Sequence, residues 1–396
     1  MTIVSARRWP VVSALGIVQI FSWGSTYYLL AVLAGPIAQD TGWPPRWIIG
    51  ALSIGFMVAA VLSPRVGSAI ARVGGRRVLA AGCILISAGL FILALATALW
   101  VFILGWAVIG AGMAAGLYDP AFATLGRLYG RDARRSISAL TLWGGFASTV
   151  CWPLSALLLT EVGWRGTAAA YAIWHICVSL PLVLWFIPRE VPLSSPVGRR
   201  NEPALRLSPD DRAAFVLTAA ILVTSGLVST IVSVHLLTFL IVQGQNMTAA
   251  VALGTLIGPA QVGARLLEMA GAGRHHPIWT MAAAVLFIAL GLLLLTCDLP
   301  FPGLALVLYG GGNGLFSIAR GALPMSFFGP ERYAQIMGRL ARPALIAQAV
   351  APLIAALLIE RTGPFITLAV VAFFAIVNVA LMAALALNVR QSRPSL

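Results

Sequence analysis

Long runs without a charged side chain are the feature that most limits how this chain can fold. Ten such runs lie between residues 9 and 389, and the shortest has 17 residues. A helix needs about 20 apolar residues to cross the hydrocarbon core of a bilayer. Only 10% of the residues are charged, and a soluble globule of this length cannot bury so much apolar surface. The pattern excludes a soluble enzyme, a secreted disulfide scaffold and a disordered protein, and it predicts an all-α membrane protein.

Two of these runs are long enough for two helices each. The run 78–118 has 41 residues and breaks near Ala98, and the run 213–264 has 52 residues and breaks at Gln243. Each of the other eight runs fits one crossing of the bilayer. Ten runs, two of them divided, therefore predict twelve transmembrane helices.

A polar segment divides the predicted helices into two sets of six. Residues 188–212, rich in Pro, Ser and charges of both signs, follow the sixth helix, so we expect halves 1–187 and 213–396 joined by a linker. Short patterns recur in the second half in the same order, which favours pseudo-symmetric, duplicated halves over coincidence in a largely apolar alphabet. The recurring residues are Ser25, Thr26 and Gln39 with Ser229, Thr230 and Gln243, and Pro153, Leu154 and Glu161 with Pro352, Leu353 and Glu360.

The arginines predict the direction in which the helices run. All 26 basic residues are arginine, and the formal net charge is +14. If the N-terminus is cytoplasmic, 23 arginines fall on the cytoplasmic side and only Arg46, Arg165 and Arg361 on the other. This is the asymmetry of the positive-inside rule, so we expect both termini in the cytoplasm and no nucleic-acid partner. The absence of lysine is typical of a GC-rich bacterial source, and hence of an inner membrane.

The sequence offers no catalytic constellation. A phosphate-binding loop of the Gly-x-x-x-x-Gly-Lys type is impossible without lysine, and paired acids and a His-Glu-x-x-His helix are missing. The four cysteines lack metal-binding spacing. We therefore expect no enzymatic activity, no cofactor and no metal, and a monomer whose partners are a small-molecule substrate and the lipid bilayer.

The segment after the second predicted helix carries a motif. Its glycines and arginines are Gly67, Arg72, Gly74, Arg76 and Arg77. Their spacing resembles the loop between helices two and three of the major facilitator superfamily, whose twelve helices, two halves and cytoplasmic termini also resemble this chain. The resemblance implies that the loop switches the protein between inward-open and outward-open states. Ala71 stands where the family has an acidic residue, so the switch is weaker here or uses other contacts.

Within that superfamily, two stretches resemble the monocarboxylate and oxalate/formate branch. They run from Phe21 to Gly24 and from Thr41 to Leu79. The branch places an anion-binding arginine in helix eight, where Arg265 is the only candidate, about one turn closer to the cytoplasm than the pattern asks. Glu268 resembles part of a degenerate second copy of the loop motif.

The resemblance also implies that helices one, four, seven and ten line a central cavity. Polar and aromatic residues at helical spacing lie on one face of three of these helices, and lipid would penalise such faces. Hydrogen bonding between helices is the alternative, above all for the serines. The cavity candidates are Gln19, Trp23, Thr26 and Tyr27 in helix one, Ser229 and His235 in helix seven, and Tyr309, Asn313 and Ser317 in helix ten.

Asp119 is the only acidic residue embedded between strongly apolar stretches, and Arg320 lies at a similar depth on helix ten. A charge at the bilayer centre costs roughly 3 kcal/mol. We therefore hypothesise an Asp119–Arg320 pair that forms in the outward-open state and breaks when the site opens inward. A pair within one half and a role of Asp119 as proton carrier are the alternatives.

These features together predict a secondary active or facilitative transporter that works by alternating access. Arginines and aromatic hydroxyls near the pathway favour a small organic anion as substrate, with proton coupling left open. Efflux of amphipathic drugs is the alternative, suggested by the tryptophans and the apolar lining.

Overall fold

Proline and glycine determine where many of the helices begin and end. Helices begin at Pro45, Pro209, Pro277, Pro302 and Pro364, because a missing N–H costs nothing in a first turn. The computed structural model describes residues 8–189, 208–271, 275–297 and 301–392. Almost all of these residues are helical.

The helices of the first half are short segments joined by tight turns. They are α1 Arg8–Gly24, α2 Leu29–Thr41, α3 Pro45–Val73, α4 Gly75–Ala94, α5 Leu99–Gly116, α6 Tyr118–Tyr129, the 3-10 helix η2 Gly130–Asp132, α7 Ala133–Gly145, α8 Ala147–Trp174, the π-helix η3 His175–Ser179 and α9 Leu180–Phe186.

The second half contains fewer and longer helices. They are α10 Pro209–Val242, α11 Met247–Gly254, α12 Ile257–Ala270, α13 Pro277–Thr296, α14 Pro302–Thr362 and α15 Pro364–Ser392.

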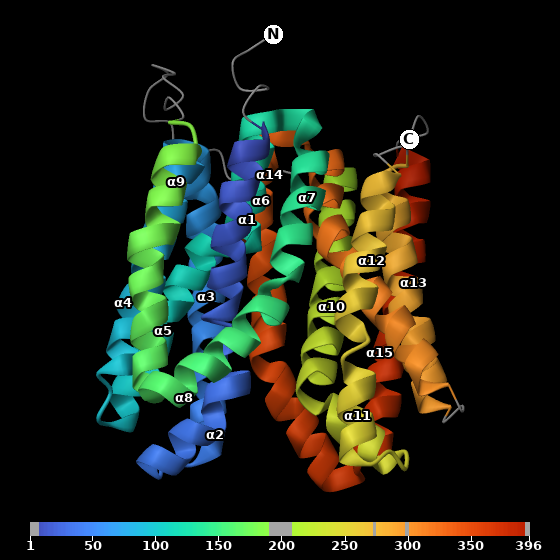
Figure 1. The fold of residues 1–396 in the computed structure, drawn as a ribbon. Coiled ribbons are helices and arrows are strands. Elements are labelled where there is room, and N and C mark those ends of the chain that lie inside the picture. Colours follow the sequence, from blue (N-terminus) through green and yellow to red (C-terminus); the bar gives the residue numbers. More distant parts are fainter. Residues whose placement is uncertain (1–7, 190–207, 272–274, 298–300, 393–396) are drawn as a thin grey trace.

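The described helices make twelve crossings. Nine segments of the described chain are long and apolar enough to span a membrane. Two of them, 133–186 and 302–362, reverse direction at Gly163 and Gly329 (Figure 1), where a φ near +70° requires glycine. Those two segments count twice, and α11 with α12 adds one more, so the predicted twelve-helix fold is confirmed.

Five crossings depart from the straight helices that uncharged runs predict. The first is broken at Ser25–Tyr28, between α1 and α2. The fourth is broken at Leu117, between α5 and α6, and the fifth at Phe146, between α7 and α8. The sixth contains the π-helix η3, and the eighth is interrupted between Gly254 and Ile257. Such breaks leave backbone groups outside the regular ladder, which is tolerated within a membrane where the surroundings are protein.

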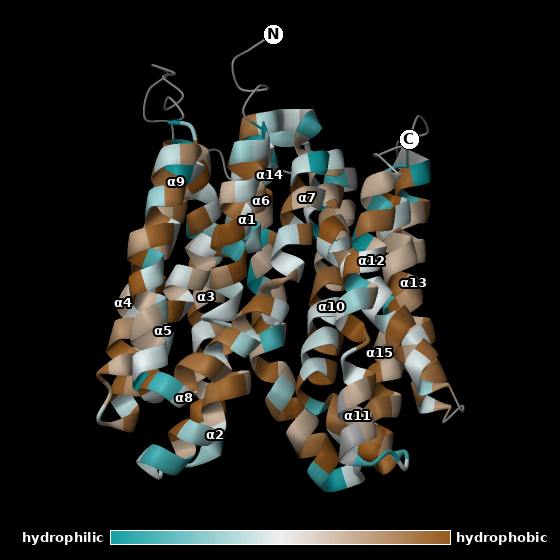
Figure 2. Ribbon diagram, viewed as in Figure 1, coloured by the Kyte–Doolittle hydropathy of each residue, from teal (hydrophilic) through white to brown (hydrophobic). Residues whose placement is uncertain are grey.

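The two halves stand side by side (Figure 1), each with its own apolar core. One cluster of buried side chains consists only of residues 214–389. Two others consist mainly of residues 11–187, with a few side chains from α14. Figure 2 shows hydrophobic residues over most of the length of the helices and hydrophilic residues gathered towards their ends, as a lipid environment demands.

One end of the bundle is named here the arginine-rich end, defined by Arg72, Arg76, Arg77, Arg127 and Arg134. Both the start of α1 and the end of α15 lie there (Figure 1). Residues 190–207 of the predicted linker lie outside the described residues, so the boundaries of the two halves stay a prediction.

Candidate functional site

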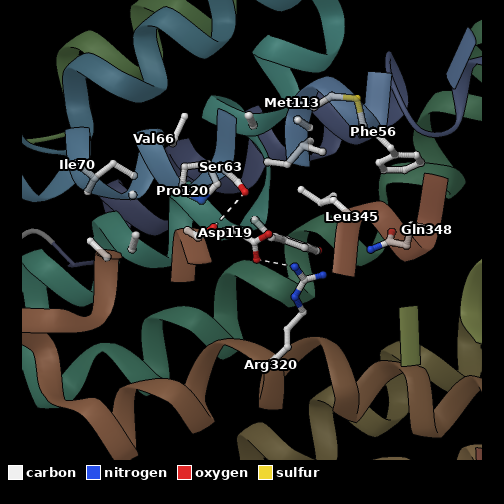
Figure 3. Close-up of a pocket in the computed structure, with 18 of the residues that line it drawn as sticks. Phe56, Ser63, Val66, Ile70, Met113, Asp119, Pro120, Arg320, Leu345 and Gln348 are labelled. Carbon is white, nitrogen blue, oxygen red and sulfur yellow. Dashed lines mark hydrogen bonds and ion pairs between the residues drawn. The ribbon is translucent and has the colours of Figure 1, made fainter. Parts of the chain in front are cut away.

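A water-sized cavity lies between the halves, towards the arginine-rich end. It has a volume of about 30 Å3 and is lined by residues of α1, α3, α5, α6 and α14 (Figure 3). Among its lining residues are Trp23, Ser63, Asp119, Arg320 and Gln348. A space of this size holds a water molecule and no substrate. The halves are therefore packed together at this level.

Asp119 and Arg320 meet across this cavity. Arg320 Nη2 lies 2.5 Å from Asp119 Oδ1, and the two side chains are only 18% and 16% exposed (Figure 3). The chain leaves helical geometry at Leu117, which starts α6 afresh and puts Asp119 in its first turn. Arg320 belongs to α14, so the pair joins the two halves. Its role in conformational switching stays a prediction.

Arg265 is buried without a countercharge among the described residues. It is 5% exposed in α12. Its Nε donates a hydrogen bond to Ser317 Oγ at 3.0 Å and its Nη2 donates to Gln261 Oε1 at 3.3 Å, both neutral acceptors. The Nη1 atom is buried and has no partner in the described protein. It faces Gly145 of α7, where a side chain would overlap the guanidinium. Arg265 thus reaches from the second half to the first.

A second ion pair joins the halves at the arginine-rich end. Arg134 Nη2 of α7 lies 2.8 Å from Glu268 Oε1 of α12. Thr280 at the start of α13 donates to the same carboxylate oxygen at 2.9 Å, and Arg134 also donates to the His275 carbonyl. Glu268, expected as part of a second loop motif, thus lies in a contact between the halves.

Three cavity candidates come together in the second half. Ser229 Oγ of α10 donates to Asn313 Oδ1 of α14 at 2.8 Å, and Tyr309, one turn away, contacts both side chains. Ser229 and Asn313 are thus hydrogen-bond partners of each other. Tyr27 reaches Ser233 of α10, which brings the first crossing to the edge of this group.

The other candidates of the first and seventh crossings are apart from it. Gln19 is fully buried and donates to the Gly116 carbonyl of α5 at 2.7 Å. Thr26 donates to a carbonyl one turn before it in its own crossing. Trp23 packs against Tyr27 and Tyr118, with ring centres 5.6 and 5.1 Å away, and its indole N–H is buried without a partner in the described part of the chain. His235 Nε2 is likewise buried and unpartnered, two turns of α10 beyond Ser229.

The predicted switch loop is mostly helix. Gly67 and Arg72 belong to α3, Arg76 and Arg77 open α4, and Gly74 with φ +84° is the only residue between them. The helix continues past the end of the uncharged run because arginines are good helix formers. Gly67 lies against Gly338 of α14, where a Cβ on Gly67 would come within 3.1 Å of Gly338 Cα.

Sequence reasoning missed several polar contacts near the site, of which the first joins the two halves. Ser63 Oγ of α3 donates to the Gly338 carbonyl at 3.0 Å. Tyr333 is fully buried and donates to the Gly321 carbonyl at 2.7 Å. Gln261, which accepts from Arg265, lies in the uncharged run 213–264, one turn before that arginine in α12. An uncharged amide in such a run was the one signal that could have found it.

Comparison with known proteins gives the family. The family model of the Major Facilitator Superfamily matches residues 15–341. Monocarboxylate transporter 11 of Homo sapiens is 34% identical over 185 residues, covering 46% of this chain and 37% of the human protein. The Mus musculus protein of that name is 35% identical over 130 residues, 33% of this chain and 27% of the mouse protein. The chain therefore matches well under half the length of these relatives.

Solved structures share the fold at low identity. The human organic anion transporter MFSD10 (TETRAN) has a TM-score of 0.75 and 16% identity, covering 95% of this chain and 99% of the other. The E. coli fucose:proton symporter FucP has a TM-score of 0.69 and 14% identity, covering 93% and 98%. The proton:xylose symporter XylE has a TM-score of 0.71 and 12% identity, covering 96% of each chain. With twelve crossings, two halves and the match over residues 15–341, the chain belongs to the Major Facilitator Superfamily.

Proposed function

We propose that this transporter carries a small organic monoanion by alternating access, and that Arg265 binds the anionic group. The observation that carries the proposal is the burial of Arg265 between the halves with only neutral acceptors, Ser317 and Gln261, within reach. An unpaired buried charge costs several kcal/mol, and natural proteins compensate it. A carboxylate bridging to the unpartnered Nη1 would supply that compensation with a charge-assisted hydrogen bond.

The count of charges around the site favours a single negative charge on the substrate. Arg320 is neutralised by Asp119, and Arg134 is paired with Glu268. One positive charge, that of Arg265, is left over among these five side chains. A monoanion balances it, a dianion would leave an excess, and a lipophilic cation would be repelled. The alternative of drug efflux therefore has less support when the drug is cationic.

Aromatic side chains near Arg265 favour a substrate with an apolar body. Trp23, Tyr27 and Tyr118 form an aromatic cluster on the first half, and Tyr28 and Tyr118 are close enough to interact with the charge of Arg265. Such rings pack well against aryl or alkyl groups. The names of three similar proteins support the anion: the two monocarboxylate transporter 11 proteins, and the organic anion transporter with the same fold.

The ion pairs Asp119–Arg320 and Arg134–Glu268 close the pathway at the arginine-rich end, which we place in the cytoplasm of a bacterial cell. Inward opening requires both pairs to separate. The present structure then corresponds to a state shut towards the cytoplasm, and halves 1–187 and 213–396 move against each other around the site. Asp119 as proton carrier is the competing role, and the two roles are separated by experiment below.

The test uses thermal unfolding of the detergent-purified protein with acetate, pyruvate, benzoate and a lipophilic cation. Bound ligand raises the unfolding temperature by mass action. We expect benzoate and pyruvate to stabilise the wild-type protein and Arg361→Met, an exposed arginine at the other end. Arg265→Met removes a charged hydrogen bond worth about 1.5–3 kcal/mol, so anion affinity should fall about 10- to 150-fold.

The same variant tests the reasoning about burial. Because Arg265→Met removes an uncompensated buried charge, the ligand-free variant should unfold at the same or a higher temperature than the wild type. Uptake of labelled benzoate into proteoliposomes should be lost in Arg265→Met and kept in Arg361→Met. Anion stabilisation that persists in Arg265→Met, or stabilisation by the cation alone, would overturn the proposal.

A further inference from the structure

A second cavity lies at the arginine-rich end, away from the contact between the halves. It has a volume of about 490 Å3 and sits between the end of α3, the start of α4 and the end of α9. Its lining residues are Val73, Gly74, Arg76, Arg77, Leu184 and Arg189. Neither the transport pathway nor the ion pairs between the halves include any of these side chains.

Three positive charges converge on this cavity. Arg76 and Arg77 come from the first turn of α4, and Arg189 comes from the segment after α9. Arg76 and Arg189 are close enough for their charges to interact. Among the described residues, no carboxylate forms an ion pair with any of the three. Like charges brought together from separate elements repel one another, and an anion bound between them removes that repulsion.

The chemistry of the cavity fits a phosphate group. Guanidinium groups bind phosphate oxygens through two parallel N–H donors, which makes arginine the preferred residue for phosphate. The start of the 20-residue helix α4 lies at the same place, and its dipole adds positive potential. Gly74, with φ +84°, lets α3 end against α4 and leaves the arginine pair facing the cavity.

The rim of the cavity distinguishes a lipid from a free phosphate. Val73 and Leu184 are both 37% exposed beside the arginines, and the neighbouring Trp185 is 79% exposed. A tryptophan in this position is typical of the membrane–water interface. We propose that the cavity binds the phosphate of an anionic phospholipid, with the arginines on the headgroup and Val73 and Leu184 against the first acyl carbons.

The proposal has a structural consequence for α3, α4 and α9. A lipid bound there would connect the α3–α4 junction to the end of the sixth crossing through a shared phosphate. Arg76 and Arg77 belong to the segment whose family counterpart takes part in switching. Phospholipid bound at the cavity should therefore stabilise the arrangement in which these arginines converge.

The experiment measures thermal unfolding of the delipidated protein titrated with phosphatidylglycerol, phosphatidylcholine or inorganic phosphate. The test variant is Arg76→Gln/Arg189→Gln. The matched control is Arg339→Gln/Arg342→Gln, two exposed arginines on α14 whose loss changes the net charge equally. We expect phosphatidylglycerol to stabilise the wild type and the control, with at least tenfold lower potency on the test variant. Phosphatidylcholine and inorganic phosphate should have little effect.

A second variant keeps the arginines and fills the cavity. Leu184→Trp narrows the apolar rim, so phosphatidylglycerol should bind it more weakly while its ligand-free unfolding temperature stays that of the wild type. Equal stabilisation of the test variant and the control by phosphatidylglycerol would overturn the site. Stabilisation of the wild type by inorganic phosphate to the same extent would overturn the assignment to lipid.

Discussion

The ion pair between Asp119 and Arg320 is asymmetric, and this predicts different costs for its two neutral variants. Asp119 lies in the first turn of α6, where the helix dipole favours a negative charge. Arg320 lies within α14, and its Nε is buried without a hydrogen-bond partner. Asp119→Asn therefore leaves a cation with no compensation. Arg320→Gln leaves an anion that the start of α6 compensates in part.

The magnitudes follow from the burial of the pair. Removing one partner of a fully buried pair costs about 3–5 kcal/mol. Because the side chains of Asp119 and Arg320 keep 16% and 18% exposure, we expect about 2–3 kcal/mol for Asp119→Asn. The helix terminus returns about 0.3–1 kcal/mol, so Arg320→Gln should cost about 1–2 kcal/mol. The free-energy cost of the double variant Asp119→Asn/Arg320→Gln should be about 2 kcal/mol smaller than the sum of the costs of the two single variants.

The assay follows the opening of the arginine-rich end. Ala123 lines the cavity beside the pair and is 1% exposed, so Ala123→Cys in a protein without the four native cysteines reports solvent access from that end. A shift of about 2 kcal/mol towards open conformations corresponds to an increase of about 30-fold in thiol reactivity. Equal rates for Asp119→Asn and Arg320→Gln, or exact additivity in the double variant, would refute the reasoning.

Transport separates the gate from the proton carrier. If the pair is a gate, Asp119→Asn slows net uptake and exchange alike, and Asp119→Arg with Arg320→Asp recovers part of both. If Asp119 carries the proton, Asp119→Asn keeps exchange between the two sides of the membrane and loses only accumulation driven by a pH gradient. The second pattern would contradict the gating role while leaving the anion site untouched.

Two further contacts between the halves give predictions of their own. A Cβ at Gly338 would lie 2.5 Å from the Ser63 carbonyl oxygen, so Gly338→Val should lower the unfolding temperature and reduce uptake more than tenfold. Gly258 faces open space, so the control Gly258→Val should leave the unfolding temperature and uptake unchanged. Similar effects of the two variants would contradict this reasoning. Arg134→Gln removes the ionic partner of Glu268; the side chains of Arg134 and Glu268 are 19% and 18% exposed. The variant should lower the free energy of unfolding by about 1 kcal/mol at low salt and by less at high salt. Thermal unfolding at two ionic strengths measures it, and a cost independent of salt would be inconsistent with an ion pair.

The sequence predicts the crossings well because their cause is local. Uncharged runs, prolines and arginines lie where helices start, span and end, and the breaks predicted near Ala98 and Gln243 fall between helices. The departures have non-local causes. The turn at Ser25 carries a hydrogen bond of 2.8 Å between Ser25 Oγ and His175 Nε2, which lies in the π-helix of the sixth crossing. The residue pattern of a single helix cannot predict this contact, because its two partners are 150 residues apart in the sequence.

The candidate site shows the same division. Helical periodicity predicted that Tyr309 and Asn313 share one face of their helix, and residue counting predicted that Asp119 and Arg320 lie at a similar depth. The backbone of Arg265 lies about one turn closer to the arginine-rich end than the pattern of the resembled branch asks. An arginine side chain is long enough to span a turn, and here it extends to Ser317. Contacts through glycine backbones, such as that at Gly338, leave no hydrophobic or charged signature at all.

The single-glycine connections determine what kind of motion these helices can share. Gly74, Gly163, Gly329 and Gly363 each join two helical segments with no other residue between them. A junction of one residue permits rotation about its own two dihedral angles and leaves no slack for one helix to slide along its neighbour. Tilting one member of such a pair must therefore swing the other about the shared glycine. These single-glycine connections therefore couple the tilts of the helices that they join.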